Sequence, residues 1–117
     1  MNIYQTIKKQ AVIFPDKTAF QQGCNEVSYA ELVDKVEQLS SIICDHFGGK
    51  PQVLRVGILL DKNFHLLVAL LSALHAGVTY IPIDPNLPDE RIKYMLADAS
   101  IEHLITSKNI ALQKKNY

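Results

Sequence analysis

The sequence predicts an α/β protein with a three-layer, mostly parallel sheet made of consecutive βαβ units and preceded by a small hairpin. Three short apolar segments, residues 56–60, 78–83 and 103–106, alternate with two helical patterns over residues 64–76 and 88–99. The connections between them are short. Strand and helix alternating in this way imply two right-handed crossovers and a parallel sheet.

The N-terminal part predicts a short helix and then a hairpin. Apolar residues recur at helical spacing over residues 3–14, Asn2 can cap the start and Pro15 stops the pattern. Two extended segments, 18–22 and 26–28, then flank the turn-forming sequence Gly23-Cys24-Asn25.

The next helix has the clearest start signal. Ser28 and Glu31 form an S-x-x-E capping box, and Val27 and Leu32 are spaced for a hydrophobic staple. One face then carries the apolar stripe Leu32, Val36, Leu39, Ile43 and Phe47, and Gly48-Gly49 is expected to end the helix.

The pattern of the second half indicates a buried helix between two apolar strands. Residues 64–76 are apolar almost all round, Asp61 or Asn63 can cap them, and Gly77 supplies the stop. The segments 56–60 and 78–83 are both expected to be buried, as strands covered on two faces are. Pro88 is expected to lie in the first turn of the following helix.

Composition excludes several classes of function. The 117 residues carry 12 Lys and Arg against 12 Asp and Glu, so no basic excess favours a nucleic-acid partner. The longest apolar run, residues 64–74, is too short to span a bilayer, and the N-terminus lacks a secretion signal, so we expect a cytoplasmic protein without membrane contact. Cys24 and Cys44 are expected to be reduced structural thiols, although the sequence leaves a disulfide open.

Few residues suggest chemistry. None of the five glycines lies in a phosphate-binding pattern, and His46, His65, His75 and His103 form no metal or triad pattern. Asp84 ends a predicted parallel strand, where α/β proteins bind ligands, but its carboxylate can also accept N–H groups of the following turn, and we favour this second interpretation. Arg91 can pair with Asp84 or Glu90. We therefore predict no catalytic, cofactor-binding or metal-binding residue.

Two segments carry a resemblance to a known family. The first is the sequence Leu74-His75-Ala76-Gly77-Val78-Thr79-Tyr80-Ile81-Pro82-Ile83-Asp84. It resembles the second core motif, L-K-A-G-x-A-Y-[VIL]-P-[LI]-D, of adenylate-forming enzymes, in particular the amino-acid adenylation domains of nonribosomal peptide synthetases. Residues 27–32 resemble the first core motif, [LV]-[ST]-Y-x-E-L, and the similarity extends over residues 3–108. His75, Thr79 and Leu87 depart from the usual Lys, Ala and Tyr.

The resemblance implies a function for a larger enzyme. Members of this family are ATP-dependent ligases that join a carboxylate to ATP as an acyl-adenylate, release pyrophosphate, require Mg²⁺, and pass the acyl group to a thiol, usually phosphopantetheine on a carrier protein. Only the first and second motifs are present here, so no catalytic residue of the family is carried over. The resemblance implies that residues 1–109 form an incomplete N-terminal subdomain of an adenylation domain, inactive alone, followed by a polar tail over 110–117.

The partners expected on this interpretation are the remainder of the adenylation domain and, for the complete enzyme, the carrier protein. Apolar surface left uncovered in an incomplete sheet is also expected to drive self-association. Two alternatives remain: a stand-alone binding or assembly module without catalysis, and a fragment of an acyl- or aryl-CoA ligase. The D-P-x-x-P-x-E-R-I continuation from Asp84 favours amino-acid activation.

Overall fold

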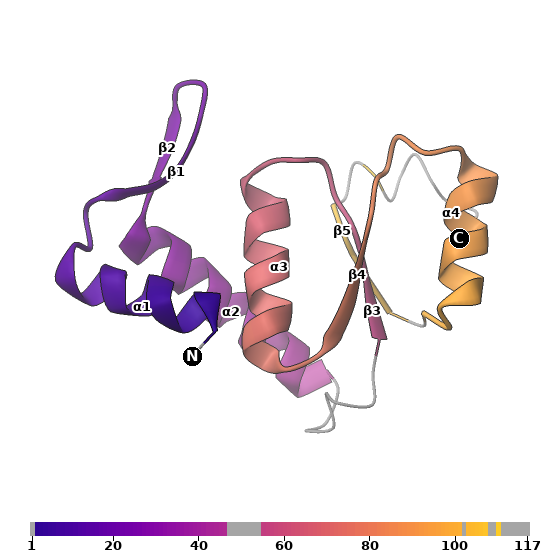
Figure 1. The fold of residues 1–117 in the computed structure, drawn as a ribbon, viewed down its shortest axis with the longest axis horizontal. Helices are drawn as coiled ribbons and strands as arrows, with labels where there is room; N and C mark the ends of the chain where they lie inside the picture. The colour runs from indigo at the N-terminus through magenta and orange to yellow at the C-terminus, as the bar shows by residue number, and fades with distance from the viewer. Residues whose placement is uncertain (1, 47–54, 102, 108–109, 111–117) are drawn as a thin grey trace.

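The computed structural model describes residues 2–46, 55–101, 103–107 and 110. Its elements, in chain order, are α1 (Ile3–Ile13), β1 (Thr18–Gln22), β2 (Asn25–Ser28), α2 (Tyr29–His46), β3 (Arg55–Leu59), α3 (Phe64–Ala76), β4 (Thr79–Ile83), α4 (Asp89–Asp98) and β5 (His103–Thr106) (Figure 1). Every helix and strand predicted from the sequence is present. The expected helix stop at Gly48-Gly49, and Phe47 before it, lie outside the described residues.

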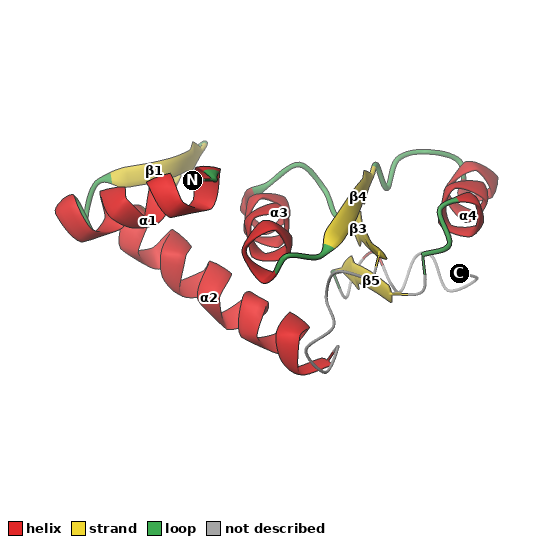
Figure 2. Cartoon of the chain, turned by 60° about the horizontal axis from the view of Figure 1, so that its bottom comes forward, coloured by secondary structure: helices red, strands yellow, loops and turns green. Residues whose placement is uncertain are grey.

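The three strands β4, β3 and β5 form a parallel sheet with β3 at its centre. The helices α2 and α3 lie on one side of this sheet and α4 on the other (Figures 1 and 2). Alternate residues of β3 serve the two faces: Val56 and Ile58 pack towards α2 and α3, whereas Leu59 packs in the cluster that contains Ile92 of α4. The predicted three-layer α/β class is therefore confirmed.

The N-terminal unit packs outside the sheet. β1 and β2 pair antiparallel as the expected hairpin, and α1 contacts α2. The side chain of Tyr4 is 1% exposed and anchors α1 in a cluster with Leu32 and Val36 of α2 and Val68 and Leu71 of α3. α3 is thus buried on two sides, which explains why its sequence is apolar almost all round.

Local signals fix the helix ends as the sequence predicts. The Asn2 side chain accepts from the N–H of Gln5 at 2.9 Å, and the Ser28 hydroxyl accepts from the N–H of Glu31 at 3.2 Å. Of the two cap candidates before α3, Asn63 is the cap: its side chain accepts from the N–H of His65 at 2.9 Å. At the other end, Gly77 adopts φ 79°, a left-handed conformation that glycine adopts without a Cβ penalty.

Two expectations from the sequence are wrong. β4 is not buried on both faces: Thr79, Tyr80 and Pro82 are exposed, because β4 lies at the edge of the sheet and α4 and α3 cover it only in part. Pro88 is the N-cap residue of α4 and precedes the first turn. Its extended backbone, with ψ 144°, sets the direction of the chain into the helix.

Ile110, the first residue of the expected polar tail, is 5% exposed and packs with Leu59, Ile83 and Ile92. Residues 111–117 lie outside the described residues. A buried apolar side chain at this position ties the segment after β5 to the α4 face of the sheet.

Candidate functional site

The carboxyl ends of the parallel strands are the usual place for a ligand in an α/β protein. Here a cavity of about 250 Å³ lies at the ends of β3 and β4. Its lining is mainly apolar, with two charged side chains among Leu60, Lys62, Leu66, Pro82, Ile83 and Asp84.

Asp84 serves the turn after β4. One carboxylate oxygen, Oδ1, accepts from the N–H of Asn86 at 2.9 Å, and the Asp84 carbonyl accepts from the N–H of Leu87 at 3.2 Å. This is the interpretation that the sequence favours for Asp84, because the carboxylate satisfies turn amides that would otherwise lack partners.

Arg91 makes neither of the ion pairs that we expected. A salt bridge that the structure does contain joins Lys8 to Glu37, on α1 and α2. The Arg91 guanidinium lies instead over the ring of Tyr94, 5.7 Å from its centroid. Both residues belong to α4, where positions three apart are neighbours on the helix surface, so the ring attracts the guanidinium locally.

The histidines with described side chains lie on α3 and β5 and make separate contacts. The His75 ring lies against the Tyr4 ring, tilted by 41°, with ring centroids 4.5 Å apart, and the His65 ring lies 6.0 Å from that of Phe64. His103 lies on β5, and the side chain of His46 is outside the described residues. Among the described residues, no three His, Cys, Asp or Glu side chains gather where a metal ion could bind.

The hydroxyl of Tyr4 has a perturbed pKa. Burial raises its pKa to about 12, and the negative charge of Glu37 with a long hydrogen bond of 3.5 Å from the Tyr4 hydroxyl adds to the effect. The hydrogen bond from Lys8, 2.9 Å away, lowers the pKa of Glu37. Tyr4 of α1 contacts both Glu37 of α2 and His75 of α3. These three residues therefore pack together where the three helices meet.

Both cysteines are free thiols and exposed. Their exposure contradicts a role in the core. Cys24 lies in the turn of the hairpin, and Cys44 lies on the solvent side of α2, where the helical stripe of buried residues does not reach.

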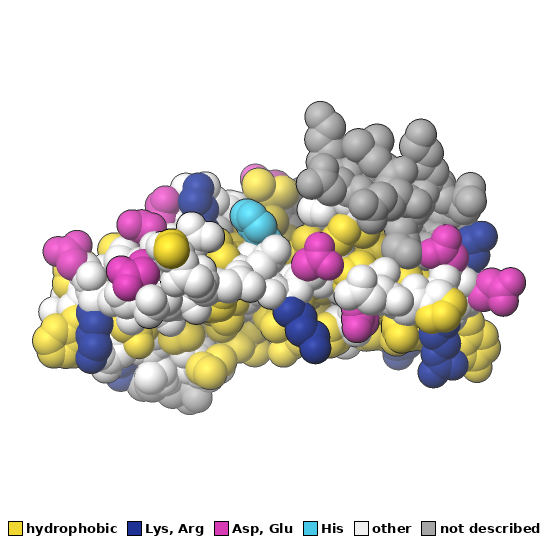
Figure 3. Space-filling model, turned by 90° about the horizontal axis from the view of Figure 1, so that it is seen from above, with side chains coloured by type: hydrophobic (Ala, Val, Ile, Leu, Met, Phe, Trp, Pro, Cys, Tyr) yellow, Lys and Arg dark blue, Asp and Glu magenta, His cyan; other side chains and the backbone are white. Residues whose placement is uncertain are grey.

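Positive and negative side chains are mixed on one face of the molecule. On the face shown in Figure 3, Lys and Arg side chains alternate with Asp and Glu along the molecule, and apolar side chains lie between them. No helix among the described residues has the length and apolar character needed to cross a membrane.

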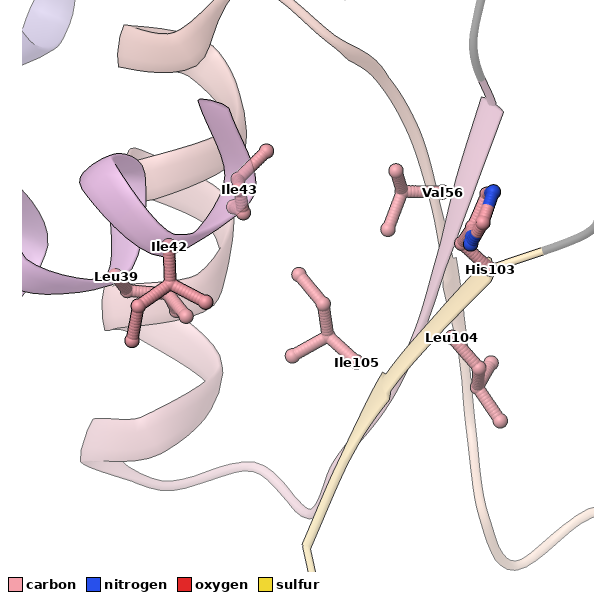
Figure 4. Close-up of a pocket in the computed structure, with 7 residues that line it drawn as sticks. All are labelled: Leu39, Ile42, Ile43, Val56, His103, Leu104 and Ile105. Atoms are coloured by element: carbon pink, nitrogen blue, oxygen red, sulfur yellow. The ribbon is translucent and has the colours of Figure 1, made fainter. Parts of the chain in front are cut away.

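A second cavity differs from the first because it is almost wholly apolar. It has a volume of about 200 Å³ and lies between the C-terminal half of α2 and strand β5 (Figure 4). We call it the β5 groove; its lining comprises Leu39, Ile42, Ile43, Val56, His103, Leu104 and Ile105. Among the lining residues that the structure describes, none is Asp, Glu, Lys or Arg.

Ile42 is the unusual residue of the β5 groove. It is 63% exposed in the C-terminal half of α2, although Ile43 beside it is 5% exposed. Sequence reasoning placed Leu39 and Ile43 on the buried stripe of α2 and missed Ile42. The available signal was its position next to that stripe, where a polar residue is expected on a solvent-facing surface.

The sequence and the fold define the class of this protein. The family of AMP-binding enzymes matches residues 7–116, nearly the whole chain, and the chain belongs to this family. Tyrocidine synthase 3 of Brevibacillus parabrevis is 35% identical over 108 residues, which are 92% of this chain and 2% of that protein.

Two solved structures share the fold. FmoA3, a nonribosomal peptide synthetase in its α-methyl-L-serine-AMP bound form, superposes with a TM-score of 0.82 at 24% identity, over 94% of this chain and 12% of that one. The N-terminal subdomain of Klebsiella oxytoca NpsA, in complex with 3-hydroxyanthranilyl-AMSN, gives a TM-score of 0.78 at 20% identity, over 89% of this chain and 26% of that one. The chain therefore corresponds to part of an adenylation domain of the kind found in nonribosomal peptide synthetases, and spans a small fraction of its relatives' length.

Proposed function

We propose that this chain is the N-terminal structural subdomain of an amino-acid-activating adenylation domain of nonribosomal peptide synthesis, and that it does not catalyse adenylation alone. The observation that carries the proposal is the match of nearly the whole chain to the AMP-binding family, while it covers only 26% of the NpsA N-terminal subdomain. Residues of the second core motif have local structural roles: Gly77 adopts a left-handed backbone conformation at the helix end, and the Asp84 carboxylate accepts from the N–H of Asn86.

In the complete enzyme the reaction uses ATP with Mg²⁺ to form an aminoacyl-adenylate and pyrophosphate, and a phosphopantetheine thiol on a carrier protein then accepts the acyl group. No step of this chemistry is assigned to the described residues. Their role is to build one wall of the lobe against which the remainder of the domain packs. A cytoplasmic location is part of the same proposal.

Amino-acid-dependent exchange of pyrophosphate with ATP tests the proposal. The chain alone is expected to show no exchange with any of the twenty common amino acids, and exchange is expected when the polypeptide that supplies the rest of the domain is added. Exchange by the chain alone, or tight binding of AMP to it, would contradict the proposal. A complex that forms without any exchange activity would instead favour a non-catalytic assembly module.

One observation supports a second substrate class. The NpsA subdomain shares this fold and is bound to an aryl compound, 3-hydroxyanthranilyl-AMSN, so the fold alone does not select amino acids. The identity of 35% to a tyrocidine synthase favours amino acids for this chain. The same exchange assay separates the two classes when aryl and fatty acids are offered beside the amino acids.

A further inference from the structure

The C-terminal ends of α2 and α3 border a polar cavity. In Figure 1 both helices end towards the bottom of the view. The cavity has a volume of about 330 Å³, and we call it the α2–α3 cavity. Its lining includes Glu37, Ser41, Cys44 and Asp45 of α2 and His75 and Ala76 of α3. It is distinct from the β5 groove, because the two share none of their described lining residues.

The end of α3 gives this cavity a negative potential. The C-terminus of an α-helix carries roughly half a negative charge, because its last carbonyls lack intrahelical donors. At the end of α3 the N–H groups of Gly77 and Val78 bond the carbonyl of Ala73, and that of Gly77 also bonds the carbonyl of Leu74. The next two residues, 75 and 76, line the cavity. Backbone acceptors without an intrahelical donor therefore lie at its border.

Asp45 adds a full negative charge. It lies in the last turn of α2, where a cationic side chain would be stabilising and an anionic one is not. Glu37, the other carboxylate of the cavity, is 2.9 Å from the ammonium of Lys8. Among the described residues that line the cavity, none is Lys or Arg, and His75 adds a positive charge only when its imidazole is protonated. The α2–α3 cavity is therefore suited to a cation.

The arrangement of acceptors favours a compact cation over a planar one. A primary ammonium carries three N–H donors around a point charge, so it can donate to a carboxylate, a hydroxyl and a helix-end carbonyl together. Asp45, Ser41 and the end of α3 supply these three kinds of acceptor. A guanidinium gains most from a bidentate carboxylate or an aromatic face. The Tyr4 ring, against which His75 lies, is 1% exposed and offers no such face.

We propose that the α2–α3 cavity binds a primary ammonium group, carried by a small amine or by a lysine side chain of another polypeptide, with Asp45 as its carboxylate partner. The inference goes beyond the proposed function and does not depend on it, because no step of adenylation is involved. The second core motif provides an internal comparison. Its usual lysine stands where this chain has His75, and a lysine there would bring a tethered ammonium to the cavity.

A two-dimensional ¹H–¹⁵N NMR titration of the chain at about pH 7.5 tests the proposal, since an ordinary imidazole is mostly uncharged there. The probe is N-acetyl-lysine amide, and N-acetyl-norleucine amide and N-acetyl-arginine amide are the controls. The lysine probe is expected to shift the amide signals of Ser41, Cys44, Asp45 and Ala76 in a saturable manner. The arginine probe is expected to bind at least about threefold more weakly, and the uncharged probe to cause no saturable shift.

Matched variants test the roles of Asp45 and of position 75. Asp45→Asn is expected to weaken binding of the lysine probe at least about tenfold, because it removes the charged acceptor. Asp34→Asn makes the same change in net charge on the same helix at an exposed residue outside the lining, and is expected to keep the affinity within about twofold.

His75→Lys is expected to abolish binding of the lysine probe, because the tethered ammonium occupies the cavity. His75→Gln loses the same ring contact with Tyr4 without adding a cation, and is expected to keep the affinity within about threefold. The dispersion of each NMR spectrum reports whether the variant is folded.

The outcomes separate this inference from the proposed function. A lysine probe that binds no more tightly than the two control probes, or an Asp45→Asn variant that behaves like Asp34→Asn, would overturn the inference and leave the proposed function standing. A folded His75→Lys variant that binds the probe as well as His75→Gln would also overturn it.

A capped alanine pentapeptide with a central lysine distinguishes the two sources of the ammonium group. Binding at least about tenfold tighter than that of the single-residue probe would identify a lysine of another polypeptide, because contacts around the lysine then contribute. Equal affinities would identify a small amine.

Discussion

The junction of α1, α2 and α3 depends on a neutral phenol at Tyr4. Its hydroxyl lies in a buried environment beside the Glu37 carboxylate, which raises its pKa to about 12 from an ordinary value of 10.0. In the unfolded chain the phenol loses its proton at the ordinary value. Raising the pH above 10 therefore favours the unfolded state, because unfolding allows ionisation that the folded state opposes.

The magnitude follows from the size of the shift. The raised pKa contributes stability that is complete below pH 10 and is lost as the pH rises towards 12. With a shift of about two units, the free energy of unfolding at about pH 11 is expected to be about 1.4 kcal/mol lower than at about pH 8 from this group alone. Tyr4→Phe keeps the ring on His75 and abolishes the titration, so its loss of stability over the same interval is expected to be smaller by that amount.

Urea denaturation followed by far-ultraviolet circular dichroism, at several pH values between about 8 and 11, measures both proteins. The comparison removes the contributions of lysines and other tyrosines, because they titrate in both chains. Parallel pH profiles for the chain and for Tyr4→Phe would refute the reasoning, since they would mean that the Tyr4 phenol ionises as readily in the folded state as in the unfolded state.

Three further outcomes are expected. Asn63→Ala removes the side chain that caps α3 and is expected to lower the free energy of unfolding, measured by urea denaturation, by about 1 kcal/mol. Asn86→Ala removes only an exposed side chain and is expected to change this free energy by less than about 0.5 kcal/mol. Gly77→Ala is expected to cost about 1 kcal/mol or more in the same assay because φ is 79°, and Gly77→Asn less, since asparagine tolerates this conformation. The isolated chain is expected to self-associate at millimolar concentration in sedimentation experiments, and Ile42→Lys to reduce this more than Ile3→Lys; a strictly monomeric chain would contradict it.

The sequence predicts those features that local interactions determine. Asn2, Ser28 and Asn63 cap helices because a short polar side chain can reach the free N–H groups two or three residues ahead, a relation readable from spacing alone. The central strand β3 is likewise readable, because burial on both faces demands a continuous apolar run. β4 has a similar composition and was expected to be buried as well. Its edge position depends on which strand pairs with β3, a long-range choice that composition does not record.

At the candidate site, too, the sequence predicted local contacts and missed long-range ones. Asp84 makes the turn contact that its neighbours in sequence predict, since the acceptor and the Asn86 donor are two residues apart. The cluster of Tyr4, Glu37 and His75 joins residues more than thirty positions apart, and the sequence contained no pattern linking them. The β5 groove was also missed, because Ile42 becomes informative only when the end of the sheet is known to lie beside it.

The structure of the junction between α3 and β4 explains the residue types of the second core motif. Gly77 ends the helix in a left-handed conformation, Pro82 keeps β4 as an outer edge, and Asp84 holds the turn that leads to α4. Each duty is met within the described chain and involves no reacting group. A change at these positions is therefore expected to act on the complete enzyme through its stability.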